Sequence, residues 1–192
     1  VSNSGTTNIT NSGTITTSGS SGSQGIQSNG NSGTANITNS GTITTSGQYS
    51  HGMYSYNNSG TETISNTSND TISTSGSNAD GIYLQSNAGT TTITNSGTIN
   101  VTGSSAVGVT LDGGGTLTNS GTISATGSAT QAIDSTGSGN DTLNLSSGSN
   151  ITGTIDLGDG TDTVNITGVN GCATAACMST SLTFANTENI NL

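Results

Sequence analysis

The chain of 192 residues lacks lysine, arginine, proline and tryptophan, and its ten carboxylates give it a formal net charge of −10. Nucleic-acid binding requires cations that displace phosphate counterions, so no nucleic-acid partner is expected. Phosphate chemistry that relies on lysine or arginine is excluded for the same reason. No apolar run approaches the roughly 18 residues that a membrane-spanning helix needs. Because strong helix formers are nearly absent, an α-helical fold is not expected either.

Apolar residues make up only 26 % of the chain and aromatic residues 3 %, whereas Thr, Ser, Gly and Asn occupy about two thirds of it. Such a composition is typical of disordered segments, which cannot bury enough surface to offset the entropy of ordering. The few branched apolar residues, however, recur at regular intervals. This regularity favours a folded repeat over disorder.

One five-residue motif repeats along the first two thirds of the chain. Asn-Ser-Gly-Thr-Ile occurs four times, and a degraded copy, residues 66–72, stands between the second and the third. The isoleucines that end these copies are spaced by 24 to 29 residues: Ile15, Ile43, Ile72, Ile99 and Ile123. Self-similarity at this period predicts a solenoid.

Two further apolar columns keep step with this one. The first lies about six residues earlier in each repeat: Ile9, Ile37, Ile64, Ile93 and Leu117. The second lies about ten residues later, usually after a glycine: Ile26, Met53, Ile82, Val109 and Ile133. Most of these residues have polar neighbours on both sides, which is the period-2 pattern of a short strand with one buried face.

Three short strands per repeat predict an all-β fold, a right-handed three-faced parallel β-helix (β-solenoid) of about seven coils of roughly 28 residues. The right-handed form is chosen because parallel crossover connections prefer it. Residues 1–134 are expected to form the repeat solenoid, and residues 135–192 to continue the same domain as a C-terminal segment with a cysteine-containing loop. One asparagine column is expected to form an amide ladder at a corner: Asn11, Asn39, Asn66, Asn95 and Asn119.

The segment from Gly137 to Ile166 and the closing stretch from Phe184 to Leu192, together with the repeats, resemble the passenger domains of bacterial type V autotransporters. The resemblance implies export by a Gram-negative bacterium through the outer-membrane translocator barrel of the same precursor. It also implies a surface-displayed or secreted adhesin or self-associating rod, whose partner is another rod or a glycan or protein of a host or biofilm surface. A purely structural stalk or extracellular filament subunit is the alternative, and ice binding is the third.

The four tyrosines and the only histidine lie close together in the sequence or in the repeat. Tyr54 and Tyr83 each follow a residue of the Ile26 column, one coil apart, so both rings are predicted to point outward. Tyr49, His51 and Tyr56 lie near them in the sequence. An exposed aromatic stack of this kind could bind a sugar ring or a second rod. The alternative is a solvent-facing ladder of residues with high strand propensity.

Two stretches, 137–143 and 158–164, fit the pattern Gly-x-Gly-x-Asp-x-apolar and resemble the calcium-binding nonapeptide of RTX β-rolls. Asp141, Asp159 and Asp162 carry the hard oxygen ligands that Ca²⁺ prefers. The copies start 21 residues apart, so the tandem spacing that lets neighbouring loops share an ion is missing. The alternative is that these residues form turns at solenoid corners. No other cofactor is expected.

The only cysteines, Cys172 and Cys177, are separated by four residues, which predicts a disulfide within a loop. Two free thiols or half of a metal site are the alternatives.

No enzymatic activity is expected. β-Helix enzymes that cleave polysaccharides assist their aspartates with cationic side chains or histidine, and the chain has no lysine or arginine. A Ser-His-Asp triad would have to use His51, and no serine stands in a nucleophile elbow. Outward threonines flank Ile15 and Ile43, as in ice-binding solenoids, but serine or asparagine replaces one of each pair in later coils.

Overall fold

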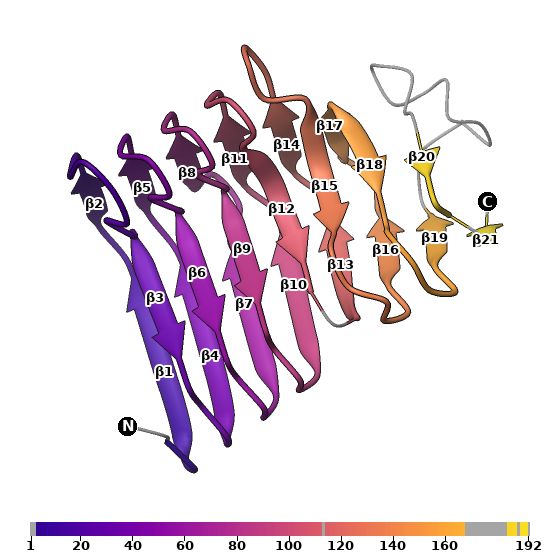
Figure 1. Ribbon diagram of the computed structural model, residues 1–192, viewed down its shortest axis with the longest axis horizontal. Coiled ribbons are helices and arrows are strands. Elements are labelled where there is room, and N and C mark those ends of the chain that lie inside the picture. The colour runs from indigo at the N-terminus through magenta and orange to yellow at the C-terminus, as the bar shows by residue number, and fades with distance from the viewer. Residues whose placement is uncertain (1–2, 113, 168–183, 188, 192) are drawn as a thin grey trace.

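Each repeat forms three short strands, and successive repeats stack in the computed structural model, which describes residues 3–112, 114–167, 184–187 and 189–191 (Figure 1). The described part is all-β and makes about six turns of roughly 27 residues. The coils are not of equal length along the chain. The spacing of stacked residues instead falls from 28 between Asn11 and Asn39 to 21 between Asn144 and Asn165.

Among the described residues, three parallel sheets of eight, six and seven strands line the solenoid, and each repeat contributes at most one strand to each sheet. The first sheet contains, in order, β1 (Thr6–Asn11), β4 (Thr34–Asn39), β7 (Glu62–Asn66), β10 (Thr91–Asn95), β13 (Gly115–Asn119), β16 (Thr142–Leu145), β19 (Thr163–Ile166) and β21 (Asn189–Asn191). The second contains β2 (Thr14–Thr17), β5 (Thr42–Thr45), β8 (Thr71–Thr74), β11 (Thr98–Val101), β14 (Thr122–Ala125) and β17 (Asn150–Thr152). The third contains β3 (Ile26–Asn29), β6 (Met53–Tyr56), β9 (Ile82–Gln85), β12 (Val107–Leu111), β15 (Gln131–Ser135), β18 (Thr154–Asp156) and β20 (Phe184–Ala185).

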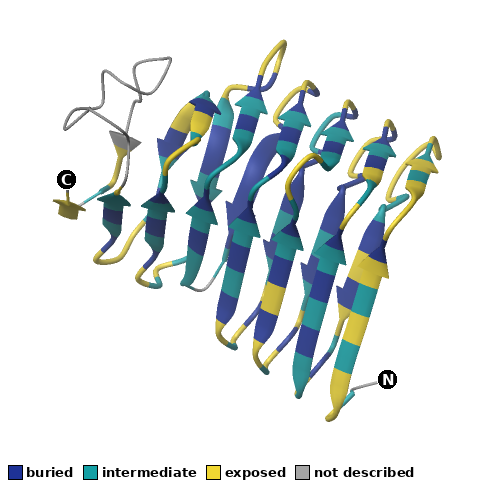
Figure 2. Cartoon of the chain, turned by 180° about the vertical axis from the view of Figure 1, so that it is seen from behind, coloured by how far each residue is buried: buried dark blue, intermediate teal, exposed yellow. Residues whose placement is uncertain are grey.

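The strand register confirms the three-faced parallel β-helix. All three predicted apolar columns pair residue for residue between coils. Their members are buried, except for Ile9 and Ile15 in the first coil, which are half-buried. Figure 2 shows the resulting alternation of buried and more exposed residues along the strands. Each coil buries few apolar residues, and the stacking of coils makes them one continuous core.

The sheets run without a break past residue 134, because β13 pairs with β16, β14 with β17 and β15 with β18. Cys172 and Cys177 lie outside the described residues, so the predicted disulfide stays a prediction. In the part of the chain that the structure describes, no helix has the length and apolar character needed to cross a membrane.

Glycine precedes most strands of the third sheet because the backbone there packs against isoleucines of the second sheet. A Cβ on Gly52 would lie 2.3 Å from Cγ2 of Ile72 and 2.6 Å from the carbonyl oxygen of Gly81. A Cβ on Gly81 would lie equally close to Ile99 and to the backbone of the next coil. A side chain at these positions would therefore push the second and third sheets apart.

The predicted asparagine ladder is confirmed at the corner between the first and second sheets. Each Nδ2 donates to Oδ1 of the next asparagine at 2.8 to 2.9 Å, from Asn11 through Asn39, Asn66 and Asn95 to Asn119. The same position is occupied by Leu145 and Ile166 in later coils, where the ladder gives way to apolar packing.

Candidate binding site on the third sheet

The outward face of the third sheet carries two tyrosines and two aspartates in one column. Strand register aligns these residues coil by coil: Gln27, Tyr54, Tyr83, Thr110, Asp134 and Asp156. The outward column therefore changes along the rod from aromatic to acidic. We call this surface the aromatic–acidic face.

The predicted stack of Tyr54 and Tyr83 is present. Their ring centroids lie 5.5 Å apart with an interplanar angle of 12°. Tyr56 lies 6.0 Å from Tyr54, and the Tyr54 hydroxyl donates to Oε1 of Gln85 at 2.6 Å. Tyr54, Tyr56 and Tyr83 are half-buried and Tyr49 is half exposed, so the rings offer surface to a ligand while their neighbours hold them in place.

His51 differs from the expectation, because it is buried rather than part of an exposed stack. Its ring lies 4.4 Å from the ring of Tyr83, and Nδ1 accepts the backbone N–H of Asp80 at 2.9 Å. Nδ1 therefore carries no proton. Burial lowers the pKa of His51 to about 4, so the imidazole is neutral at pH 7.

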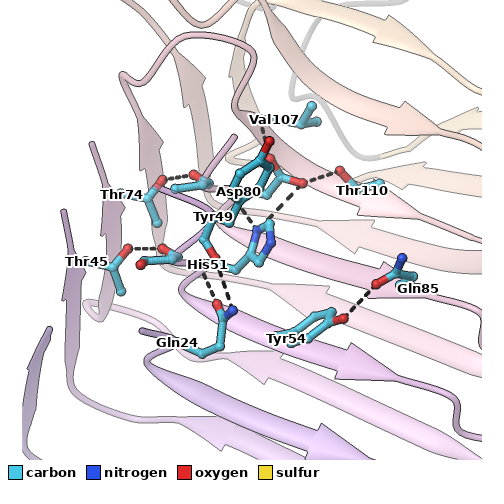
Figure 3. Close-up of polar contacts among 12 residues, drawn as sticks. Gln24, Thr45, Tyr49, His51, Tyr54, Thr74, Asp80, Gln85, Val107 and Thr110 are labelled. Atoms are coloured by element: carbon cyan, nitrogen blue, oxygen red, sulfur yellow. Dashed lines mark hydrogen bonds and ion pairs between the residues drawn. The ribbon is translucent and has the colours of Figure 1, made fainter. Parts of the chain in front are cut away.

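His51 belongs to a ladder at the corner where the chain enters the third sheet (Figure 3). Oε1 of Gln24 accepts the backbone N–H of His51, Nδ1 of His51 accepts that of Asp80, and Oδ1 of Asp80 accepts that of Val107. At each step a side chain satisfies the backbone amide one coil further along. This corner thus requires side chains that accept hydrogen bonds, which is a structural reason for a buried histidine and aspartate.

Asp80 is a buried carboxylate with two hydrogen bonds. Besides the Val107 amide, the Thr110 hydroxyl donates to Oδ2 at 2.9 Å. Burial raises the pKa of Asp80 to about 6, against the lowering effect of these two donors. Oδ2 lies 3.9 Å from Nδ1 of His51, but this contact is no ion pair because the imidazole is neutral.

A pocket of about 220 Å³ opens between these groups. Its walls come from turns and strands of four successive coils, and include Tyr49, His51, Asp80, Tyr83, Thr110 and Asp134. Asp134 is half-buried, and Nε2 of Gln131 donates to its Oδ1 at 3.0 Å. Burial, and then the nearby charge of Asp156, raises the pKa of Asp134.

A larger hollow of about 540 Å³ lies at the corner where the chain enters the first sheet. It is lined by small and polar residues, among them Ser59, Thr61, Thr90, Thr116 and Asn140. Its described lining contains no ring and no carboxylate, so it offers a ligand only hydroxyl, amide and backbone groups. The smaller pocket is the better candidate, because it combines an aromatic wall with charge.

The three aspartates considered for calcium differ in burial and in their contacts. Asp141 and Asp162 are buried one coil apart, whereas Asp159 is exposed in a turn. Oδ1 of Asp141 accepts the Gly115 amide at 2.7 Å, and Oδ1 of Asp162 accepts the Asp141 amide at 2.8 Å. Both therefore accept hydrogen bonds from backbone amides at the corner before the first sheet. Among the described residues, no group of three or more His, Cys, Asp or Glu is placed to hold a metal, and calcium binding stays an untested prediction.

Sequence reasoning gathered the four tyrosines and His51 correctly but missed Asp80, Thr110 and Asp134. A signal for two of them was available: Thr110 and Asp134 follow members of the Ile26 column, just as Tyr54 and Tyr83 do. Asp80 lies at a corner position that Gln24 and His51 occupy in earlier coils, and because the residue type changes from coil to coil no repeated motif marks it.

Comparison of the chain with family models, curated proteins and solved structures finds no match. The geometry of this chain and the resemblance of its sequence to passenger domains are the observations that bear on its function.

Proposed function

We propose that the chain is a binding rod of the adhesin type, displayed on a bacterial surface or secreted, and that its aromatic–acidic face contacts the ligand. The single observation that carries the proposal is one pocket lined by two tyrosines, Tyr49 and Tyr83, and by two carboxylates, with the ring of Tyr54 stacked on that of Tyr83. Elsewhere the outward positions of the first and second sheets carry mainly Thr, Ser and Asn. Aromatic rings with a polar edge are the residues that most often anchor binding surfaces.

The rest of the fold supports this role by holding the face rigid. Backbone hydrogen bonds join consecutive coils, and the asparagine ladder fixes one corner. A preorganised surface loses little entropy on binding, and repeated weak contacts along a rod add by multivalency. A partner of this kind could be a glycan or protein of a host or biofilm surface, or a second rod.

A non-catalytic role is part of the proposal. His51 is the only histidine of the chain, and its Nδ1 already accepts a backbone hydrogen bond. With a pKa of about 4 it would be a weak general base at neutral pH.

The proposal is tested by adhesion of beads that carry the purified rod. The surfaces are immobilised polysaccharides, immobilised extracellular-matrix proteins and the rod itself. Replacement of both rings, Tyr54→Thr with Tyr83→Thr, should abolish adhesion to every surface that the parent binds. A matched control, Ser73→Thr with Asn100→Thr, changes outward residues of the second sheet and should adhere like the parent.

A purely structural stalk or filament subunit is the second candidate. It is favoured by the continuous side-chain ladders, which stiffen the rod without offering free groups to a ligand. A stalk predicts that the tyrosine and control variants behave alike. Ice binding is a weaker third proposal, because the outward threonines of the second sheet are replaced at Ser73, Asn100 and Ser124.

A further inference from the structure

The pocket on the aromatic–acidic face exists because a small residue stands between a ring and a carboxylate. Tyr83, Thr110 and Asp134 occupy the same outward position in three successive coils. Strands of neighbouring coils lie about 4.8 Å apart, so the backbone positions of Tyr83 and Asp134 are separated by about 10 Å. Thr110 is short and turned toward Oδ2 of Asp80, which leaves the space between ring and carboxylate open.

The ring of Tyr83 is packed against other rings on one side and faces the pocket on the other. Tyr83 stacks with Tyr54 in the preceding coil and with His51 at the corner. On the side of the following coil its register partner is Thr110, which has no ring. One face of Tyr83 is therefore available to a flat or compact group inside the pocket. The face of an aromatic ring carries partial negative charge and attracts cations.

The titratable groups around the space are negative or neutral at pH 7. Asp80 and Asp134 line the pocket, Asp156 follows Asp134 in the column, and His51 is neutral. The chain has no lysine or arginine with which to compensate these charges. Of the two oxygens of Asp134, only Oδ1 accepts a hydrogen bond from a described residue. Ionised carboxylates can only accept hydrogen bonds, so a complementary ligand donates them, and a cationic donor also compensates their charge.

We propose that this pocket binds a guanidinium or ammonium group, supplied by an arginine or lysine side chain of a protein partner, between the ring of Tyr83 and the carboxylate of Asp134. This assignment rests on the proposed function and narrows its ligand to a basic polypeptide segment. A neutral sugar would leave the carboxylates uncompensated, and an anion would be repelled by them. A guanidinium matches both walls, since its plane stacks on a ring and its edge donates to a carboxylate.

The test uses calorimetry at low salt with a synthetic peptide of six Gly-Arg repeats. The comparison peptide replaces every arginine with citrulline, which keeps the shape and the hydrogen-bond donors but not the charge. The arginine peptide should bind, and the citrulline peptide should bind about tenfold more weakly or not at all. Asp134→Asn and Tyr83→Thr should each weaken binding of the arginine peptide about tenfold, whereas Tyr83→Phe keeps the ring and should retain it.

Net charge alone could attract a basic peptide, so a matched control removes the same charge elsewhere. Asp159 is exposed in a turn outside the pocket, and Asp159→Asn should bind like the parent. Equal weakening by Asp134→Asn and Asp159→Asn, or equal binding of the two peptides, would overturn the proposal. Tighter binding of free spermidine than of the arginine peptide would overturn the assignment to a polypeptide.

Failure of this inference is distinguishable from failure of the proposed function. If the bead assay loses adhesion in the tyrosine double variant but not in Asp134→Asn, the face binds a ligand that is not cationic, and only this inference fails. If neither variant changes adhesion, the aromatic–acidic face is not the binding surface and both fail. Melting curves and circular dichroism establish that each variant is folded before binding is compared.

Discussion

Replacement of His51 tests whether the corner ladder is built as described. His51→Ala removes the acceptor of the buried Asp80 amide and the ring that packs on Tyr83. An unsatisfied buried N–H costs about 1 to 3 kcal/mol, and loss of an aromatic pair costs about 0.5 to 1.5 kcal/mol. We therefore expect the free energy of unfolding to fall by about 2 to 4 kcal/mol.

His51→Gln is the matched variant, because Gln24 already fills the equivalent position one coil earlier and accepts an amide there. A glutamine at position 51 should restore the hydrogen bond but not the ring, and recover roughly half or more of the loss. The assay is urea unfolding followed by tyrosine fluorescence and circular dichroism. Equal stability of the alanine and glutamine variants would refute the assignment of the imidazole as an acceptor.

Three further predictions follow from the core, the ladder and the buried carboxylate. Ile99→Ala leaves a cavity at a fully buried site and should lower the free energy of unfolding by about 2 to 5 kcal/mol. Ile190→Ala, at a half-exposed site, should change it by less than about 1 kcal/mol. Similar urea midpoints for the two variants would contradict the burial of Ile99. Asn66→Ala breaks two hydrogen bonds of the asparagine ladder and should lower the free energy of unfolding by about 1 to 3 kcal/mol. Asn29→Ala, at an exposed site, should lower it little. A lower melting temperature for Asn29→Ala than for Asn66→Ala would contradict a stabilising role of the ladder. Asp80 has a folded pKa of about 6 against an ordinary value of 3.8, so its contribution to stability is present below pH 3.8 and is lost as the pH rises through 6. His51 acts in the opposite sense, since its contribution is present above pH 6.5 and is lost as the pH falls to about 4. Stability of Asp80→Asn should consequently rise more steeply between pH 4 and 6 than that of the parent, and a parallel pH profile in urea melts would contradict the raised pKa.

The columns of the core could be predicted from the sequence because two periods act together. The alternation of polar and branched residues sets which side chains point inward, and the long repeat sets which of them stack. Ile43, Ile72 and Ile99 are neighbours in register for both reasons. The outward direction of Tyr54 and Tyr83 follows from the same alternation, and so does their contact.

The corner before the third sheet could not be predicted in the same way as the asparagine ladder. Its position recurs in each coil, but the residue type changes from Gln24 to His51 to Asp80, so no repeated motif marks it. The sequence groups His51 with the outward tyrosines, yet the turn directs it against the Asp80 amide. The pocket depends on a difference in side-chain size along the outward column, with Thr110 between Tyr83 and Asp134, which a search for repeated motifs does not detect.

If one pocket on the aromatic–acidic face receives the ligand, tyrosine NMR should show which rings the ligand contacts. The chain has four tyrosines, so ring-labelled protein gives four sets of resonances that single Tyr→Phe variants assign. On titration with the peptide of Gly-Arg repeats, the rings of Tyr49 and Tyr83, which line the pocket, should shift most. Tyr56 lies outside the pocket lining and should shift least. No shift, or equal shifts of all four rings, would contradict the account.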